Sequence, residues 1–179
     1  MGPDRDEQFR EFAAANRPSL VRTAFLMCGD ADEAHDLVQL TLLRVHRRWA
    51  AIRRVDDPQV YARRVLINLT ASWWRRRLRV RLEPLDPYDA PTTDDAIERV
   101  NLRDQLWRAV HTLPPRTRAV LVLRYFEDMT EADAARVLDC SVGSVKSQAS
   151  RGLAALRQLL GEQSYDLGTF SITEPEVVR

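Results

Sequence analysis

Apolar residues recur every three or four positions along most of this chain, which is the spacing of one face of an α-helix. The N-terminal half predicts three helices, whose inward positions are Phe9, Phe12, Leu20 and Ala24, then Ala34, Leu37, Val38, Thr41, Val45 and Trp49, and then Tyr61, Val65, Leu66 and Leu69. Pro18 should kink or restart the first helix, and Gly29 should end it. Asp30 is a candidate cap for the second helix.

The C-terminal half predicts four more helices, and no strand pattern of any length appears. The first of the four has its apolar positions at Ile97, Val100, Leu106, Val110 and Leu113. Pro115 lies near the first turn of the second, an apolar core helix. Thr130 and Ser141 are the expected N-caps of the last two, with a tight turn at Asp139 and Cys140 between them. The chain is therefore predicted to be all-α and to end in a helix-turn-helix.

The last helix has one apolar and one polar face. Its apolar positions are Val142, Val145, Ala149, Leu153 and Leu156. Its polar face carries Ser144, Lys146, Ser147, Gln148, Ser150 and Arg151, with no acidic residue. Such short donors and long cations reach base edges and phosphates when a helix lies in the major groove of DNA. A helical hairpin with a merely solvated face has the same pattern, so this segment alone leaves both interpretations open.

Charge is distributed unevenly. The 179 residues carry a formal net charge of only +1, yet from Arg44 to Arg81 the only charges that oppose arginine are Asp56 and Asp57. A basic helix bearing Trp73 and Trp74 suits phosphates and unpaired bases, although a solvated arginine face over core tryptophans is the alternative. Adjacent residues lie about 100° apart on a helix, so at least one tryptophan should meet solvent, a neighbouring domain or DNA.

These patterns predict two small helical domains at 5–81 and 97–160, joined by the acidic, proline-containing linker 82–96. The linker is an extended acidic segment, and composition alone leaves open whether it is a plain spacer or has a binding role. A tail at 161–179 is either disordered or a regulatory contact.

Catalytic chemistry finds little support in the sequence. Cys28 and Cys140 form no CxxC pair, His35, His46 and His111 lack a metal-ligand spacing, and no glycine-rich phosphate loop is present. We therefore expect no enzyme, no metal and no cofactor. With no signal peptide and no apolar run that could cross a bilayer, a cytoplasmic location is expected.

Three segments resemble the extracytoplasmic-function sigma factors, the small bacterial specificity subunits of RNA polymerase. LPPRTRAVLVLRYFEDMTEADAARVLDCSVGSVKSQASRGLAALR at 113–157 resembles their region four. GDADEAHDLVQLTLLRVHRRW at 29–49 and YARRVLINLTASWWRRR at 61–77 resemble the polymerase-binding and promoter-melting helices of region two. The likeness covers about residues 7–160, and the ending SWWRRR and the segment QASRGL at 148–153 look most like an actinobacterial subgroup of the sigma-E type.

The resemblance implies a protein that binds core RNA polymerase and promoter DNA and starts transcription, with an anti-sigma factor as a further partner. The implied polymerase-binding residues are Asp36, Gln39, Leu40 and Arg44. The implied contacts to the −10 element are Arg63, Arg64, Asn68, Trp73, Trp74, Arg75, Arg76 and Arg77, and the polar face from Ser144 to Arg151 is assigned to the −35 element. A stand-alone helix-turn-helix regulator is the second hypothesis, and an adaptor that binds no DNA is the third.

Four positions depart from the family pattern. Asp139 stands at the hairpin turn where glycine is usual, and Leu40 follows Gln39 where glutamate is usual. Gln148 replaces a common arginine of the recognition helix, and Ser72 replaces a frequent aspartate. These differences bear on affinity for the core enzyme and on the promoter sequence that is read.

Overall fold

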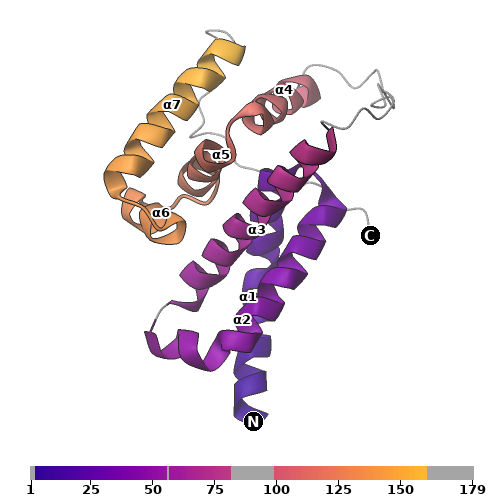
Figure 1. Cartoon of the computed structure of the whole chain (residues 1–179), viewed down its shortest axis with the longest axis vertical. Coiled ribbons are helices and arrows are strands. Elements are labelled where there is room, and N and C mark those ends of the chain that lie inside the picture. The colour runs from indigo at the N-terminus through magenta and orange to yellow at the C-terminus, as the bar shows by residue number, and fades with distance from the viewer. Residues whose placement is uncertain (1–2, 56, 82–98, 161–179) are drawn as a thin grey trace.

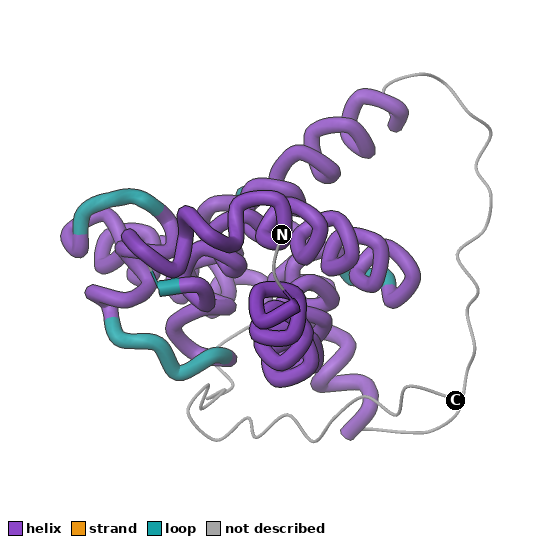
Figure 2. The backbone as a smooth tube through the Cα atoms, turned by 90° about the horizontal axis from the view of Figure 1, so that it is seen from below, coloured by secondary structure: helices purple, strands orange, loops and turns teal. Residues whose placement is uncertain are grey.

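The computed structural model describes residues 3–55, 57–81 and 99–160, and the elements in these ranges are helices (Figures 1 and 2). The N-terminal unit consists of α1 (Pro3–Cys28), α2 (Ala31–Val55) and α3 (Pro58–Arg81). The C-terminal unit consists of α4 (Arg99–Thr112), α5 (Pro115–Leu121), the π-helical turn η1 (Val122–Phe126), α6 (Glu131–Leu138) and α7 (Val142–Leu160). The predicted all-α class is confirmed. The linker 82–96 and the tail 161–179 lie outside the described residues, and the domain bounds stay a prediction.

Helix α1 runs through Pro18 as one helix, so of the two expected outcomes, a kink or a restart, the restart is wrong. Apolar residues on both sides of the proline pack against the same neighbours, and this burial holds the helix together across the missing hydrogen bond. The predicted end of α1 is confirmed, because Gly29 has φ +78° and its N–H donates to Phe25 O at 2.8 Å. Asp30 then caps α2, with Oδ1 accepting from Glu33 N at 3.0 Å.

The core of the N-terminal unit lies between its three helices. Trp49 of α2 packs on Phe9 and Phe12 of α1, with ring centroids 5.5 and 5.0 Å apart. Further along, Leu20, Leu37, Val38, Val45, Leu66 and Leu69 are buried together with Trp73 of α3. The periodic apolar positions of the sequence therefore form this core, as predicted.

The helix-turn-helix forms as the capping residues predict. Asp133 N donates to Thr130 Oγ1 at 3.1 Å, and Ser144 N donates to Ser141 Oγ at 3.1 Å. Asp139 adopts the left-handed conformation, with φ 50° and ψ 56°. Val142 was expected on the apolar face but is 39% exposed, because this first residue of α7 stands beside the turn.

Gly152 allows α7 to approach α5 closely. A Cβ atom at this position would lie 2.8 Å from Thr117 Cγ2 and 2.9 Å from Leu121 Cδ1. Helix α5 and the following η1 lie at the centre of the C-terminal unit, since every side chain from Thr117 to Leu123 is buried. After Leu121 the α-helix α5 widens into the π-turn η1, which ends at Phe126.

The two units share a core. The C-terminal unit lies along α1 and α3 in Figure 1, where α5, η1 and α6 contact them. Leu26, Met27, Val60 and Ile67 of the N-terminal unit are buried in one apolar cluster with Ala119, Val120, Ala134 and Val137 of the C-terminal unit. Residues of α3 that the sequence assigned to DNA therefore lie near an internal contact.

Candidate nucleic-acid interface

An exposed strip on α2 carries the residues expected to bind polymerase. Asp36, Gln39, Leu40 and Arg44 are all exposed, and their spacing of three and four residues places them on one face. Leu40 is 46% and Leu43 is 55% exposed, which is unusual for large apolar side chains on an otherwise charged surface. Leu43 was missed at the sequence level, although it lies three residues after Leu40 on the same strip.

The polar face of α7 is open. Ser144, Lys146, Ser147, Ser150 and Arg151 are exposed, and Arg151 Nε donates to Ser147 O at 3.2 Å. Lys146 Nζ lies 3.4 Å from Glu131 Oε2 of α6, in an exposed ion pair that is easily given up for a phosphate. The structure thus brings these donors together on one solvent-facing surface.

Gln148 differs from the rest of this face because it is half-buried. Its Oε1 accepts a hydrogen bond of 2.7 Å from Thr117 Oγ1 of α5. The amide oxygen is therefore already engaged, and the amide N–H groups remain as the donors that this side chain can offer.

Both tryptophans of α3 pack against other parts of the protein, but each lies in a different environment. Trp73 is 8% exposed in the core of the N-terminal unit, which favours the alternative of a core tryptophan over the expected contact with DNA bases. Trp74 packs edge-on against it at 5.2 Å and donates from Nε1 to Met27 O at 2.9 Å. The Arg118 guanidinium lies 4.3 Å from the Trp74 ring centroid, so Trp74 meets the neighbouring unit, which is one of the three environments expected.

Asn68, Arg75, Arg76 and Arg77 remain exposed along α3. Arg75 Nη2 donates to Ser72 Oγ at 2.8 Å, and Arg77 lies 5.0 Å from the Trp73 ring centroid. These arginines form the open basic part of the helix.

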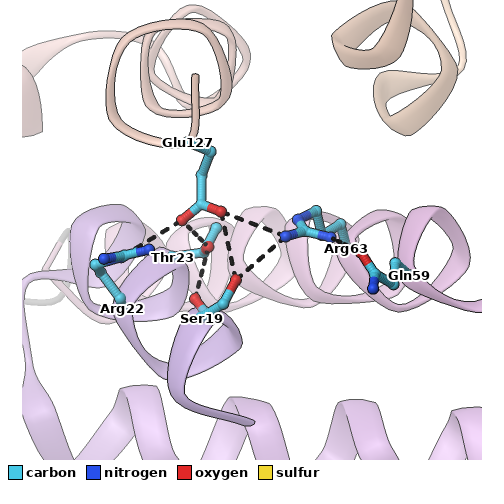
Figure 3. Close-up of polar contacts among 6 residues, drawn as sticks. All are labelled: Ser19, Arg22, Thr23, Gln59, Arg63 and Glu127. Carbon is cyan, nitrogen blue, oxygen red and sulfur yellow. Dashed lines mark hydrogen bonds and ion pairs between the residues drawn. The ribbon is translucent and has the colours of Figure 1, made fainter. Parts of the chain in front are cut away.

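Arg63 and Arg64, by contrast, contact the C-terminal unit. Arg64 Nη2 donates to Arg136 O of α6 at 2.7 Å. Arg63 Nη2 lies 3.5 Å from Glu127 Oε2, and Figure 3 shows this carboxylate among side chains of α1 and α3. Two arginines that were expected to contact DNA therefore already interact with acceptor atoms of the same chain.

Arg118, which the sequence analysis missed, organises the contact between the units. Its side chain is 1% exposed and donates from Nε to Val110 O at 3.2 Å and from Nη2 to the carbonyl oxygens of His111 and Leu113. Nη1 donates across the units to Met27 O at 2.7 Å. Burial lowers the pKa of this guanidinium to about 10, which leaves it charged at neutral pH.

The need for Arg118 follows from two prolines. The carbonyls of Val110 and His111 would ordinarily accept from the N–H groups four residues on, but those positions are Pro114 and Pro115. Arg118 supplies the missing donors. An arginine shortly after a Pro-Pro pair, inside an apolar run, was the available signal in the sequence.

His111 lies at the same contact, against the end of α1. A Cβ on Gly29 would lie 2.7 Å from His111 Cε1, so glycine is required there for space as well as for its positive φ. Burial, and then the charge of Arg118, lower the pKa of His111 to about 4. The imidazole is therefore neutral at neutral pH.

Across 3–55, 57–81 and 99–160, no helix has the length and apolarity that a membrane crossing requires. The same residues contain no cluster of three or more His, Cys, Asp or Glu side chains that could hold a metal ion.

Comparison with known proteins gives a consistent result. Residues 12–80 match the family model of Sigma-70 region 2, and residues 103–156 match that of Sigma-70, region 4. The RNA polymerase sigma-E factor of Streptomyces coelicolor is 34% identical over 171 residues, which cover 94% of this chain and 95% of that protein. The ECF RNA polymerase sigma factor SigE of Mycolicibacterium smegmatis is 31% identical and covers 90% of this chain and 63% of its own length.

Two solved structures share the fold. The sigma factor RpoE of Bartonella quintana, solved with the anti-sigma factor NepR, has a TM-score of 0.68 at 22% identity and covers 88% of this chain and 99% of its own. CnrH, solved with the cytosolic domain of CnrY, has a TM-score of 0.64 at 22% identity and covers 89% and 91%.

Proposed function

The chain belongs to the extracytoplasmic-function RNA polymerase sigma factors of the sigma-E type, and we propose that α2 binds the core enzyme while α3 and α7 contact promoter DNA. As a sigma factor it directs core polymerase to specific promoters and initiates transcription. The observation that carries this conclusion is the 34% identity to a sigma-E factor along 94% of the chain. A stand-alone helix-turn-helix regulator is not favoured, because the N-terminal unit matches region 2 as well.

The exposed strip on α2 supports its role in polymerase binding. Asp36 offers a carboxylate beside two leucines that are each about half exposed, a combination of apolar surface and charge that suits a protein partner. Asp36→Arg should weaken binding to core polymerase by about fivefold or more, since reversing an interfacial charge costs more than ~1 kcal/mol. Glu11→Arg on α1 makes the same charge change at another exposed acidic site and should bind normally.

Pull-down of each variant by purified core polymerase measures this directly. If Asp36→Arg assembles as well as the unchanged protein, α2 is not the docking surface.

The open face of α7 supports sequence readout of the −35 element. Arg151→Ala should change the preference among upstream-element sequences, because a good base contact is worth about 1 to 3 kcal/mol. Arg157→Ala, an exposed arginine nearer the end of the same helix, is the control and should leave the preference unchanged. Transcription by the reconstituted holoenzyme from a promoter library gives both results, and identical preferences for all three proteins would contradict the assignment.

The exposed part of α3 should act differently. Arg75, Arg76 and Arg77 are expected to contact phosphates, which carry little sequence information. Their loss should weaken binding to all promoters alike and reduce the salt dependence by up to about one unit of slope for each contact. A promoter-selective defect would contradict this role.

An anti-sigma factor is proposed as a third partner, because the structurally similar sigma factor RpoE was solved with the anti-sigma factor NepR bound.

A further inference from the structure

Four side chains of the N-terminal unit surround the carboxylate of Glu127 (Figure 3). Thr23 Oγ1 donates to Oε1 at 2.9 Å, and Ser19 Oγ lies 3.4 Å from Oε2. Arg22 Nε is 3.7 Å from Oε1, and Arg63 Nη2 is 3.5 Å from Oε2. The Glu127 side chain is 4% exposed, so these four donors, which we call the oxyanion cluster, enclose it almost completely.

The backbone of the C-terminal unit directs Glu127 into the cluster. The π-turn η1 ends at Phe126, and Glu127 N donates to Val122 O at 3.0 Å. Asp128 follows with a positive φ of 49° and turns the chain away. π-turns are uncommon and occur often at functional positions, and here the turn places one carboxylate against α1 and α3.

The oxyanion cluster has the composition of a phosphate site. It combines two guanidinium groups with two hydroxyls, which are donors typical of contacts to the backbone of DNA. Two positive charges face a single carboxylate, so the cluster keeps an excess of positive charge when Glu127 is bound. Arg63 lies on α3, the helix that carries the exposed arginines Arg75, Arg76 and Arg77 further along.

We propose that the oxyanion cluster binds a backbone phosphate of promoter DNA, and that in the free chain Glu127 occupies this site and holds the C-terminal unit over α3. The proposal rests on the function proposed above, because it assumes that α3 meets DNA. Glu127 and the phosphate compete for the same donors, so the two units must separate before this part of α3 can bind DNA.

Neighbouring contacts also hold the two units together. Arg64 is held by Arg136 O of α6, and Trp74 and Arg118 both donate to Met27 O at the end of α1. The recognition face of α7 remains open to solvent in this state. In the free chain, therefore, Arg63, Arg64 and Trp74 of α3 are held by contacts within the protein, whereas Arg75, Arg76, Arg77 and the recognition face of α7 remain exposed.

The test compares Glu127→Gln with Asp128→Asn in the full chain. Both remove one negative charge from adjacent positions, but Asp128 is exposed and asparagine tolerates its left-handed backbone. The probe is a short fluorescein-labelled single-stranded DNA without promoter sequence, titrated by anisotropy at low salt. Glu127→Gln should bind it at least tenfold more tightly than the unchanged chain, and Asp128→Asn should bind less than twofold more tightly.

Two further variants connect the gain to the cluster. Adding Ser19→Ala and Thr23→Val to Glu127→Gln should remove most of the gain, because the released donors are then lost. Glu127→Asp keeps the charge but shortens the side chain, and it should give an intermediate gain in DNA affinity of about threefold. This variant replaces Glu127→Gln in the test if Glu127→Gln fails to fold. Small-angle X-ray scattering should show a larger radius of gyration for each variant that gains affinity.

Equal gains in DNA affinity for Glu127→Gln and Asp128→Asn would mean that the effect comes from the net charge alone, and this result would overturn the proposal. So would a folded Glu127→Gln or Glu127→Asp with unchanged DNA affinity and unchanged scattering. Promoter-dependent transcription with core polymerase, run in parallel on the unchanged chain, separates the two levels. Normal transcription without the affinity gain refutes only the oxyanion site, whereas absent transcription refutes the proposed function.

Discussion

Replacement of Arg118 by methionine should destabilise the protein by about 3 kcal/mol, because methionine keeps the apolar stem but removes every donor. Four carbonyls accept from the guanidinium, but two have a second donor. Val110 O also accepts from Leu113 N at 3.2 Å, and Met27 O also accepts from Trp74 Nε1 at 2.9 Å.

The carbonyls of His111 and Leu113 then lose the side-chain donor that the structure gives them. A buried carbonyl without a partner costs about 1 to 3 kcal/mol. The contact of Arg118 with the Trp74 ring adds about 0.5 to 2 kcal/mol, and relief of the desolvation of the charge offsets part of the total. These terms give the estimate of about 3 kcal/mol, which is a large part of the stability of a typical domain.

Urea denaturation followed by circular dichroism measures this difference, and a thermal scan should show a lower melting temperature by roughly 6 to 12 °C. The control is Arg116→Met on the same helix, because Arg116 is exposed and its loss should change stability by less than about 0.5 kcal/mol. If Arg118→Met is as stable as Arg116→Met, the guanidinium does not satisfy the carbonyls that the two prolines leave open.

Three further outcomes are expected. The His111 pKa of about 4 lies below the ordinary 6.5, so between these pH values the unfolded chain binds more protons than the folded chain. The contribution of His111 to stability is therefore fully present above about pH 6.5 and is lost as the pH falls toward 4. With a discount for partial exposure the loss is about 1 kcal/mol at about pH 5, and urea melts of His111→Asn should show a flatter pH dependence than the unchanged chain. Gly152→Ala should lower the free energy of unfolding by about 1 to 3 kcal/mol in the same assay, because the added Cβ would meet Thr117. Gly143→Ala, whose added Cβ has its nearest atom 3.9 Å away, should not destabilise the protein. Equal effects of the two substitutions would refute the close approach of α7 to α5. Trp73→Ala should lower stability by about 3 to 5 kcal/mol and impair transcription equally from duplex and pre-melted promoters, and selective recovery on the pre-melted template would show that the ring acts on DNA.

The sequence by itself determined that the described parts of the chain are helical and where several of the helices begin or end. Thr130 and Ser141 cap residues three positions later, and Gly29 accommodates a positive φ at its own position, so each signal acts over less than two helical turns. Amphipathic spacing likewise gave the core of the N-terminal unit and the open face of α7, because a helix of fixed geometry has one side to bury. Pro18 was the exception, since packing on both sides of it outweighed the local break.

Only the tertiary structure decided how the basic and aromatic side chains of α3 and α5 are used. Arg118 finds Met27 O at a sequence separation of 91 residues, and Arg63 finds Glu127 at a separation of 64. A sequence pattern shows that an arginine is present, but the acceptor that it meets depends on which helix faces pack together. Burial of Trp73 and the contact of Trp74 with Arg118 of the C-terminal unit follow from the same packing. The hydrophobic effect that drives this packing is non-directional, so the complete fold decides which partner each side chain meets.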